Sequence, residues 1–273
     1  MFQECSNLKS LDFTNFDTKN VSNMYFMFNG CSTLTSLDLT NFNTKNVSNM
    51  YGMFCDCSKL TSLDLTNFNT AKVTDMGNMF LGCSNLTSLD LTNFNTAKVT
   101  DMHGMFKGCS ALTSLDLTNF NTAEVRDMNR MFYMLDESST ALTTIYVSDN
   151  FVTTNVQNGE NMFKNCTKLK GFIKYFLLAT DHQYANYTTG YFTSGCGYAE
   201  FDDATGTLTF RYKAVKPKGA YDLNVQAFTP QWNKLGTNVK KVVFNASFAN
   251  ARPTICYAWF YNSSYLLITI LAY

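Results

Sequence analysis

The sequence has little of what most enzymes and nucleic-acid-binding proteins depend on. Its 273 residues include only two histidines and three prolines, and 21 basic side chains are balanced by 21 acidic ones. Proteins that recognise nucleic acid usually carry a clustered basic face, so nucleic acid is not expected as a partner. With 15% charged and 45% hydrophobic residues, the chain has the composition of a folded protein rather than a disordered one.

Catalytic motifs are lacking as well. The sequence shows no Ser-His-Asp or Cys-His arrangement and no glycine-rich phosphate loop after an expected strand. Its regularly spaced aspartates are equivalent to one another, whereas acid-base catalysis needs two groups in different environments. We therefore expect no catalytic residues, no enzymatic activity and no cofactor.

Long hydrophobic runs are also missing. The most apolar tract, residues 265–273, is too short to span a bilayer, so no transmembrane segment is expected. The chain opens inside a repeat, without the charged and apolar regions of a signal peptide. We interpret it as a fragment of a larger secreted or surface protein, or as a truncated gene product.

What the sequence does contain is a 26-residue repeat, clearest in residues 79–104, MFLGCSNLTSLDLTNFNTAKVTDMHG. Copies begin at Met1, Met27, Met53, Met79, Met105 and Met131 and, after a longer unit, at Met162. A fixed period of this length is typical of a solenoid, in which each repeat buries its apolar face against its neighbours.

Within each repeat, apolar residues recur with two different spacings. Leu63 and Leu65 alternate with polar residues, which predicts a short strand at Ser62–Thr66. The residues that follow have the spacing of one helix face: Val73, Met76, Met79, Phe80 and Cys83. Each repeat is therefore expected to consist of a strand, a loop and a short helix.

The ends of this helix also carry signals. Thr70 is expected to cap its start and Gly82 to close it in the left-handed conformation. The positions equivalent to Gly82 hold residue types that tolerate positive φ: Gly30, Asp56, Gly108 and Asn165.

The sequence of the repeat resembles that of a known family. Leu60, Leu63 and Leu65 have the leucine-rich-repeat spacing L-x-x-L-x-L, and an expected spine of stacked phenylalanines replaces the usual Asn or Cys: Phe16, Phe42, Phe68, Phe94 and Phe120. Together with M-F-x-x-C-S-x-L-T-S-L-D-L-T-N-F-N-T, this resembles the BspA-like leucine-rich-repeat surface proteins of bacteria. The resemblance covers most of residues 1–172 and implies an adhesive protein that is secreted or displayed on the cell surface.

Cysteines recur with the same period. Cys5, Cys31, Cys57, Cys83 and Cys109 are 26 residues apart, and Cys166 holds the same place in the last clear repeat. Side chains that point in parallel from stacked coils favour a buried ladder of free thiols over disulfides or a zinc site. Cys196 and Cys256 could pair with each other if the protein is exported.

After the repeats the pattern changes. Residues 198–201 and 207–212 flank a turn-rich DDATG segment and predict a hairpin, followed by a short helix at 230–235 and a strand at 239–244. The predicted fold is an α/β solenoid of leucine-rich repeats at 1–172, a small β-rich insert or linker module at 173–250, and a truncated second repeat array at 251–273.

The most regular polar feature is a row of carboxylates that we call the aspartate file. It contains Asp12, Asp38, Asp64, Asp90 and Asp116. A solvated face that keeps the sheet soluble explains the file without any ligand, and a weak cation site is the alternative. No other metal site is expected.

Two functions remain open. A binding module would recognise a protein or glycan on a host or microbial surface, as the resemblance implies, whereas a stalk would only hold another domain away from the cell. A binder needs exposed residues that differ from repeat to repeat, and Tyr, Trp and Arg are the usual anchors. The candidates are Tyr25, Tyr51, His103, Arg130, Trp232 and Trp259.

Overall fold

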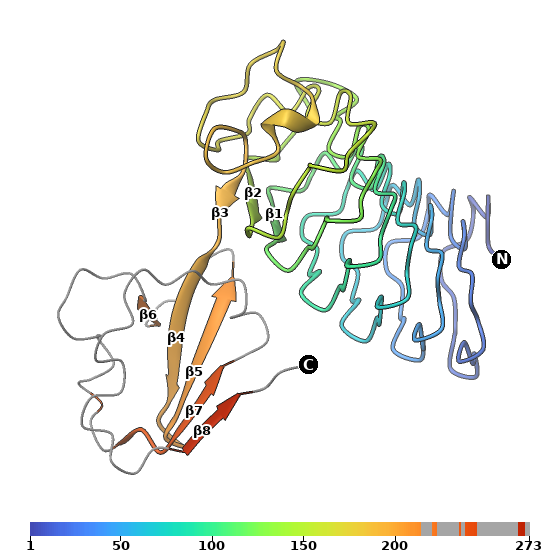
Figure 1. Cartoon of the computed structure of the whole chain (residues 1–273). Helices are drawn as coiled ribbons and strands as arrows, with labels where there is room; N and C mark the ends of the chain where they lie inside the picture. The colour runs from blue at the N-terminus through green and yellow to red at the C-terminus, as the bar shows by residue number, and fades with distance from the viewer. Residues whose placement is uncertain (214–219, 223–234, 236–237, 245–266, 271–273) are drawn as a thin grey trace. The chain divides into compact units, whose positions relative to one another are not determined.

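Figure 1 shows the computed structural model, which describes residues 1–213, 220–222, 235, 238–244 and 267–270. The chain divides into two units, Met1–Thr193 and Ser194–Tyr273, and each has its own apolar core. This division differs from the boundary expected at residue 172. The boundary expected at residue 250 lies outside the described residues.

The 26-residue repeats of unit 1 lie side by side as successive coils (Figure 1), joined by backbone hydrogen bonds between equivalent positions. The N–H groups of Met76, Asn78 and Phe80 donate to carbonyls of the next repeat at 3.0, 2.7 and 3.0 Å. Parallel bridges continue this ladder: Asn23 to Asn49, Asn49 to Asp75, Asp75 to Asp101, Asp101 to Asp127, and Asp127 to Asn158. The repeats therefore share one register.

The segments expected to be helical are built of turns instead. Asn78 and Gly82 have φ of 54° and 70°, and two left-handed residues four positions apart cannot belong to a right-handed helix. The N–H groups of Asn78 and Phe80 bond to the next repeat, so they are not available to carbonyls four residues earlier in the same repeat. Four-residue turns fill the intervals, such as the one closed by the Met79 N–H donating to the Met76 carbonyl, with equivalent bonds of 3.1–3.3 Å in successive repeats.

The left-handed column expected at Gly82 is confirmed. Its members all have φ between 54° and 73°: Gly30, Asp56, Gly82, Gly108 and Asn165. A second left-handed column, which the sequence did not suggest, lies four residues earlier in each repeat: Phe26, Gly52, Asn78, Gly104, Arg130 and Asn161.

Burial alternates as predicted for the strand segments. Leu63 and Leu65 are buried while Ser62, Asp64 and Thr66 are exposed. Regular strands occur at the equivalent positions of two later repeats, β1 at Ser114–Leu117 and β2 at Thr144–Val147, which pair in parallel. A 3-10 helix, η1 at His182–Tyr184, follows, and β3 at Thr193–Ser194 completes a sheet of order β1-β2-β3.

A column of stacked phenylalanine rings fills the core of unit 1. It is formed by the second residue of each repeat, with ring centroids 5.5–5.8 Å apart: Phe2, Phe28, Phe54, Phe80, Phe106, Phe132 and Phe163. The phenylalanines expected to form the spine, such as Phe68 and Phe94, are buried beside it. The stacked column thus uses the M-F pair that opens each repeat.

The thiols of the cysteine ladder are free, and all of them are buried except that of Cys5, which is partly exposed. Cys31, Cys57, Cys83 and Cys109 each donate a thiol hydrogen bond at 3.1 Å to the carbonyl of the phenylalanine 29 residues earlier. Burial raises the pKa of Cys109 to about 12. The pairing considered for Cys196 and Cys256 lies outside the described side chains.

Thiol labelling should therefore report folding. At about pH 8 we expect the native protein to leave Cys57, Cys83 and Cys109 unmodified by maleimide, because buried thiols of raised pKa hold no accessible thiolate. Cys5 is partly exposed and serves as the reactive control. Mass spectrometry of native and denatured samples checks this, and a peptide linking two ladder cysteines would contradict it.

Unit 2 contains a five-stranded sheet of order β6-β4-β5-β7-β8. The predicted hairpin is confirmed as β4 at Cys196–Asp202 and β5 at Thr207–Lys213, with Gly206 at φ 66° in the turn. The predicted strand is β7 at Lys241–Phe244, parallel to β5. The short edge strand β6 is Tyr221–Asp222.

Most residues of the predicted C-terminal helix and of the predicted second repeat array lie outside the described part of the chain. These include residues 230–234 of the helix and residues 251–266 of the array. The described part of that array is β8 at Leu267–Ile270, which pairs in parallel with β7. It therefore joins the sheet of unit 2.

Candidate binding surface on the turn side of the repeats

One row of residues, from the exposed Tyr25 to the half-buried Asn129, is held in the same way in five consecutive repeats. An Asn or Asp side chain accepts a hydrogen bond from the backbone N–H two residues later, at 2.8–3.0 Å. The acceptors are Asn23, Asn49, Asp75, Asp101 and Asp127. The residues so positioned, which we call the turn-face row, are Tyr25, Tyr51, Gly77, His103 and Asn129.

Aromatic rings gather along this row. Tyr25 and Tyr51 stack with centroids 5.2 Å apart and an interplanar angle of 16°, and Tyr51 lies 5.4 Å from the ring of His103. The Tyr25 side chain is 50% exposed, while Tyr51 and His103 are partly buried. Three of the six predicted binding residues are thus brought together.

Gly77 allows Tyr51 and His103 to meet although they belong to repeats that are not adjacent. A β-carbon at residue 77 would lie 2.8 Å from Cε1 of His103 and 3.0 Å from Cδ2 of Tyr51. Any larger residue would therefore separate the two rings. The glycine has a steric role in this row that its sequence context does not reveal.

Polar groups connect the same rings. Nδ1 of His103 lies 2.7 Å from Oδ1 of Asp101, and Nε2 lies 2.8 Å from the Asn78 amide nitrogen. The amide also donates to the Tyr51 hydroxyl at 2.8 Å. In this arrangement Nδ1–H donates to Asp101, and a neutral Nε2 accepts from Asn78.

The electrostatics of the row are set by three carboxylates in consecutive repeats, Asp75, Asp101 and Asp127. The hydrogen bond to Asp101 raises the pKa of His103, burial opposes this, and the charges of the three carboxylates add to the rise. Burial raises the pKa of Asp75, and the charge of Asp101 contributes to that shift. Protonation of His103 would therefore relieve repulsion along the row, while giving up the bond that the neutral Nε2 accepts from Asn78.

This pKa shift predicts a pH-dependent contribution to stability. A raised pKa in the folded state stabilises it below the ordinary value of 6.5, and this contribution is lost as pH rises through the folded pKa. We expect His103→Gln to cost more at about pH 5.5 than at about pH 8.5. The difference should stay below about 1 kcal/mol, because both partners are about 30% exposed.

Urea unfolding at the two pH values measures the difference, and titration of the His103 Hε1 NMR signal measures the pKa directly. The His103→Gln spectrum assigns that signal against His182. A folded-state pKa below 6.5, or an equal cost of the substitution at both pH values, would contradict the prediction.

Arg130 does not belong to the turn-face row. It lies one residue beyond Asn129 in the second left-handed column, with φ of 56°, and its N–H donates to the Glu160 carbonyl at 3.1 Å. Its side chain is exposed. Trp232 and Trp259 lie outside the described residues.

The aspartate file has local partners. In each of its five members Oδ1 accepts hydrogen bonds from the N–H and hydroxyl of the threonine two residues later, at 2.5–3.0 Å. These bonds lower the pKa of Asp12, Asp38 and Asp64. Among the described residues no group of three or more His, Cys, Asp or Glu could hold a metal ion.

In part of each left-handed column, large residues alternate with glycine, a pattern that the sequence analysis did not identify. A β-carbon at Gly52 would lie 2.1 Å from the Phe26 ring. A β-carbon at Gly104 would lie 2.1 Å from Oδ1 of Asn78. A β-carbon at Gly82 would likewise lie 2.2 Å from Oδ1 of Asp56. At these three places a large residue in one repeat faces a glycine in the next, whereas Arg130 is followed by Asn161 and Gly82 by Gly108.

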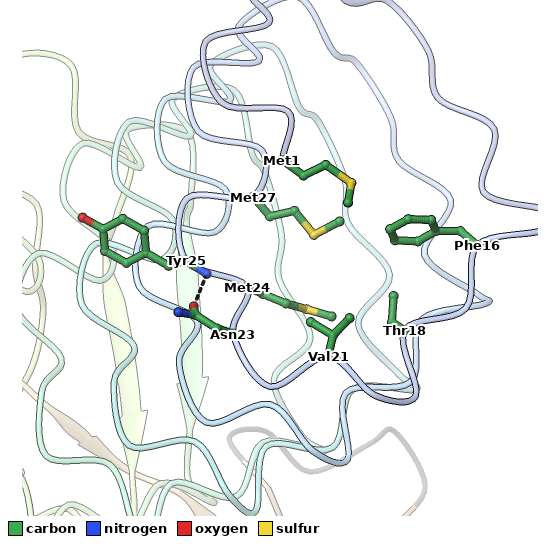
Figure 2. Close-up of a pocket in the computed structure, with 8 residues that line it drawn as sticks. All are labelled: Met1, Phe16, Thr18, Val21, Asn23, Met24, Tyr25 and Met27. Carbon is green, nitrogen blue, oxygen red and sulfur yellow. Dashed lines mark hydrogen bonds between the residues drawn. The ribbon is translucent and has the colours of Figure 1, made fainter.

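A small cavity lies at the N-terminal end of the stack, next to Tyr25. Figure 2 shows Met1, Phe16, Met24 and Met27 converging on it, while the ring of Tyr25 points away from them. Its volume of about 80 Å³ is too small for most organic ligands. The cavity belongs to the packing of the first repeat, and Tyr25 belongs to the outer surface.

The repeats match a family model. The model is described as "Mycoplasma protein of unknown function, DUF285", and it matches residues 1–89 and 57–176, more than half of the chain. No curated protein and no solved structure matches the sequence. Within the described residues, no helix is long and apolar enough to cross a membrane.

Proposed function

We propose that this chain, which belongs to the repeat family described as Mycoplasma proteins of unknown function, DUF285, is a non-enzymatic binding module. In this proposal the repeats form a solenoid of the leucine-rich, BspA-like kind, carried by a secreted or surface protein. Its function is adhesion to a protein or glycan on a host or microbial surface.

The observation that carries the proposal is the composition of the turn-face row. Its backbone is fixed identically from repeat to repeat while its side chains differ, which is what recognition of a particular partner requires. Stacked rings beside an amide and carboxylates offer both apolar area and hydrogen bonds. Tyrosines in such settings commonly contribute much of the binding energy.

The alternative is a stalk with no partner of its own. The aspartate file and its threonines repeat almost unchanged, which suits a spacer that needs only solubility. The turn-face row favours the binding module, because a spacer does not require Tyr25, Tyr51 and His103 to differ from Gly77 and Asn129.

The test compares two triple variants on arrays of host glycans and host surface proteins. For each ligand that binds the parent protein, replacing Tyr25, Tyr51 and His103 by alanine should weaken binding at least thirtyfold, as expected for loss of a hot spot. Replacing Asp38, Asp64 and Asp90 by asparagine should change it by less than about threefold.

Circular dichroism and thermal unfolding must show that both triple variants remain folded. A larger loss in the aspartate variant, especially with a calcium requirement, would move the site to the aspartate file. Absence of binding to every array member by the parent protein would favour the stalk.

A further inference from the structure

A second surface, at the far end of unit 1 from Tyr25, carries the largest exposed apolar side chains of the repeats' C-terminal end. They lie in residues 170–178, which we call the apolar loop. Their exposed fractions are 70% for Phe172, 59% for Phe176, 60% for Leu177 and 83% for Leu178. Such a cluster on a soluble surface usually marks an interaction site.

The apolar loop is held in this exposed position by its alternate residues. Ile173 and Tyr175 pack against the core, and the Tyr175 hydroxyl accepts the Asn165 N–H at 3.0 Å. The buried Tyr191 hydroxyl accepts the Phe176 N–H at 3.0 Å and donates to the Phe176 carbonyl at 3.3 Å. Exposure of Phe172 and Phe176 therefore follows from the way their neighbours are anchored.

The base and tip of the loop are closed by backbone contacts. Lys170 and Lys174 form an antiparallel bridge, and the Ala179 N–H donates to the Phe176 carbonyl at 2.9 Å, which turns the chain at Leu177 and Leu178. The two leucines therefore occupy the tip of a tight turn.

Lysines precede the apolar loop in the sequence and also lie within it, and Glu137 of the preceding repeat lies nearby, its carbonyl accepting the Thr167 hydroxyl at 3.0 Å. Residues 161–180 contain four lysines and no Asp or Glu, and all four lysines are exposed: Lys164, Lys168, Lys170 and Lys174. In the described part of the chain none of them forms an ion pair. Asp181, the next residue, uses its Oδ1 to accept the Asn161 N–H at 2.8 Å.

We propose that the apolar loop inserts into the surface of a membrane that contains anionic lipids. Phe172, Phe176, Leu177 and Leu178 would enter the boundary between headgroups and acyl chains, while the lysines contact lipid phosphates. This combination of apolar side chains and a basic rim is how peripheral proteins bind anionic bilayers. The charge favours a lipid surface over a second protein, since none of the four lysines forms an ion pair with another described residue.

Co-sedimentation of the full chain with sucrose-loaded vesicles tests this. We expect binding to vesicles of phosphatidylcholine with phosphatidylserine, little binding to phosphatidylcholine alone, and weaker binding at high salt. Replacing Phe176, Leu177 and Leu178 together by serine should lower the partition coefficient at least tenfold. Replacing Lys164, Lys168, Lys170 and Lys174 by glutamine should also lower it at least tenfold.

Matched controls separate the loop from general charge. The variant with glutamine at four exposed lysines elsewhere, Lys9, Lys45, Lys59 and Lys98, loses the same charge and should retain binding within about threefold. The alanine variant at Tyr25, Tyr51 and His103 should also bind vesicles normally. The vesicle experiment therefore tests the apolar loop independently of the turn-face row. All the residues substituted in the serine and glutamine variants are exposed, and circular dichroism must show that each variant is folded.

The proposal is overturned if the parent protein does not sediment with anionic vesicles. It is also overturned if glutamine at Lys9, Lys45, Lys59 and Lys98 lowers binding as much as glutamine at Lys164, Lys168, Lys170 and Lys174. It is also overturned if the serine variant abolishes self-association of the parent protein and leaves vesicle binding unchanged. In that case a second copy of the chain is the occupant.

Discussion

Replacing Phe80 by alanine should lower the free energy of unfolding by about 3–5 kcal/mol, the usual cost of deleting a buried aromatic ring. The Phe80 side chain is fully buried, and its ring stacks on those of Phe54 and Phe106 at 5.8 Å on each side. The coils cannot collapse to fill the space, because inter-repeat hydrogen bonds fix their spacing. The substitution therefore leaves a cavity and removes two ring contacts. Urea unfolding followed by circular dichroism measures the loss.

Phe2 provides the matched control for Phe80. It is the first ring of the same column and is only partly buried, with one stacked neighbour, Phe28. Phe2→Ala should cost less than half as much as Phe80→Ala. Equal costs at the two positions would show that the stacked column does not determine stability, whereas a small cost at Phe80 would show that the repeats repack around the cavity.

Repeat register was the part of the structure that the sequence predicted best. Cysteines 26 residues apart lie on one buried ladder, and the glycines and asparagines aligned with Gly82 have positive φ. Both predictions rest on a period that must be shared by all repeats if each is to pack on the next. Local residue preference and stacking agree at these positions.

Local geometry between these fixed points was predicted less well. The spacing of Val73, Met76, Met79 and Phe80 fits a helix, but the same residues also point inward from a chain of turns. The deciding feature was the second left-handed position, occupied by Phe26, Asn78 and Arg130 as well as by glycine. Phenylalanine and arginine are not residues from which positive φ is normally inferred, so the helix could not be excluded from the sequence.

The candidate site was only partly predictable. Variation from repeat to repeat identified Tyr25, Tyr51 and His103, but it also selected Arg130, which lies in another column. Contact between Tyr51 and His103 depends on the space left by Gly77 in the repeat between them. The hydrogen bonds of the Asn78 amide to Tyr51 and His103 depend in turn on that contact, whereas those of Asp101 to His103 are local.

The second large effect is expected for Thr70→Val. Thr70 was expected to cap a helix, but Asn69 caps the local turn, with its Oδ1 accepting the Ala71 N–H at 3.1 Å. The buried Thr70 hydroxyl instead bridges to the next repeat, accepting from the Asn95 N–H at 2.7 Å and donating to the Asn95 carbonyl at 3.0 Å. Valine has the same shape and satisfies neither group. Because Asn95 is itself exposed, the freed groups stay within reach of water, and we expect the free energy of unfolding to fall by about 1–2 kcal/mol, from two part-buried hydrogen bonds worth about 0.5–1.5 kcal/mol each.

The same bridge recurs through the stack, which gives the Thr70 prediction internal replicates. Thr44 bridges to Asn69 and Thr96 to Asn121 with donor–acceptor distances of 2.7–3.0 Å, so valine at either position should cost a similar amount. Thr61 is exposed and provides the matched control, for which valine should change stability by less than about 0.5 kcal/mol. Serine at residue 70 keeps the hydroxyl and should recover most of the loss, apart from the missing methyl group. If Thr70→Val and Thr70→Ser are equally destabilising, the methyl packing and not the bridge accounts for the cost, and the inter-repeat role of the hydroxyl is wrong.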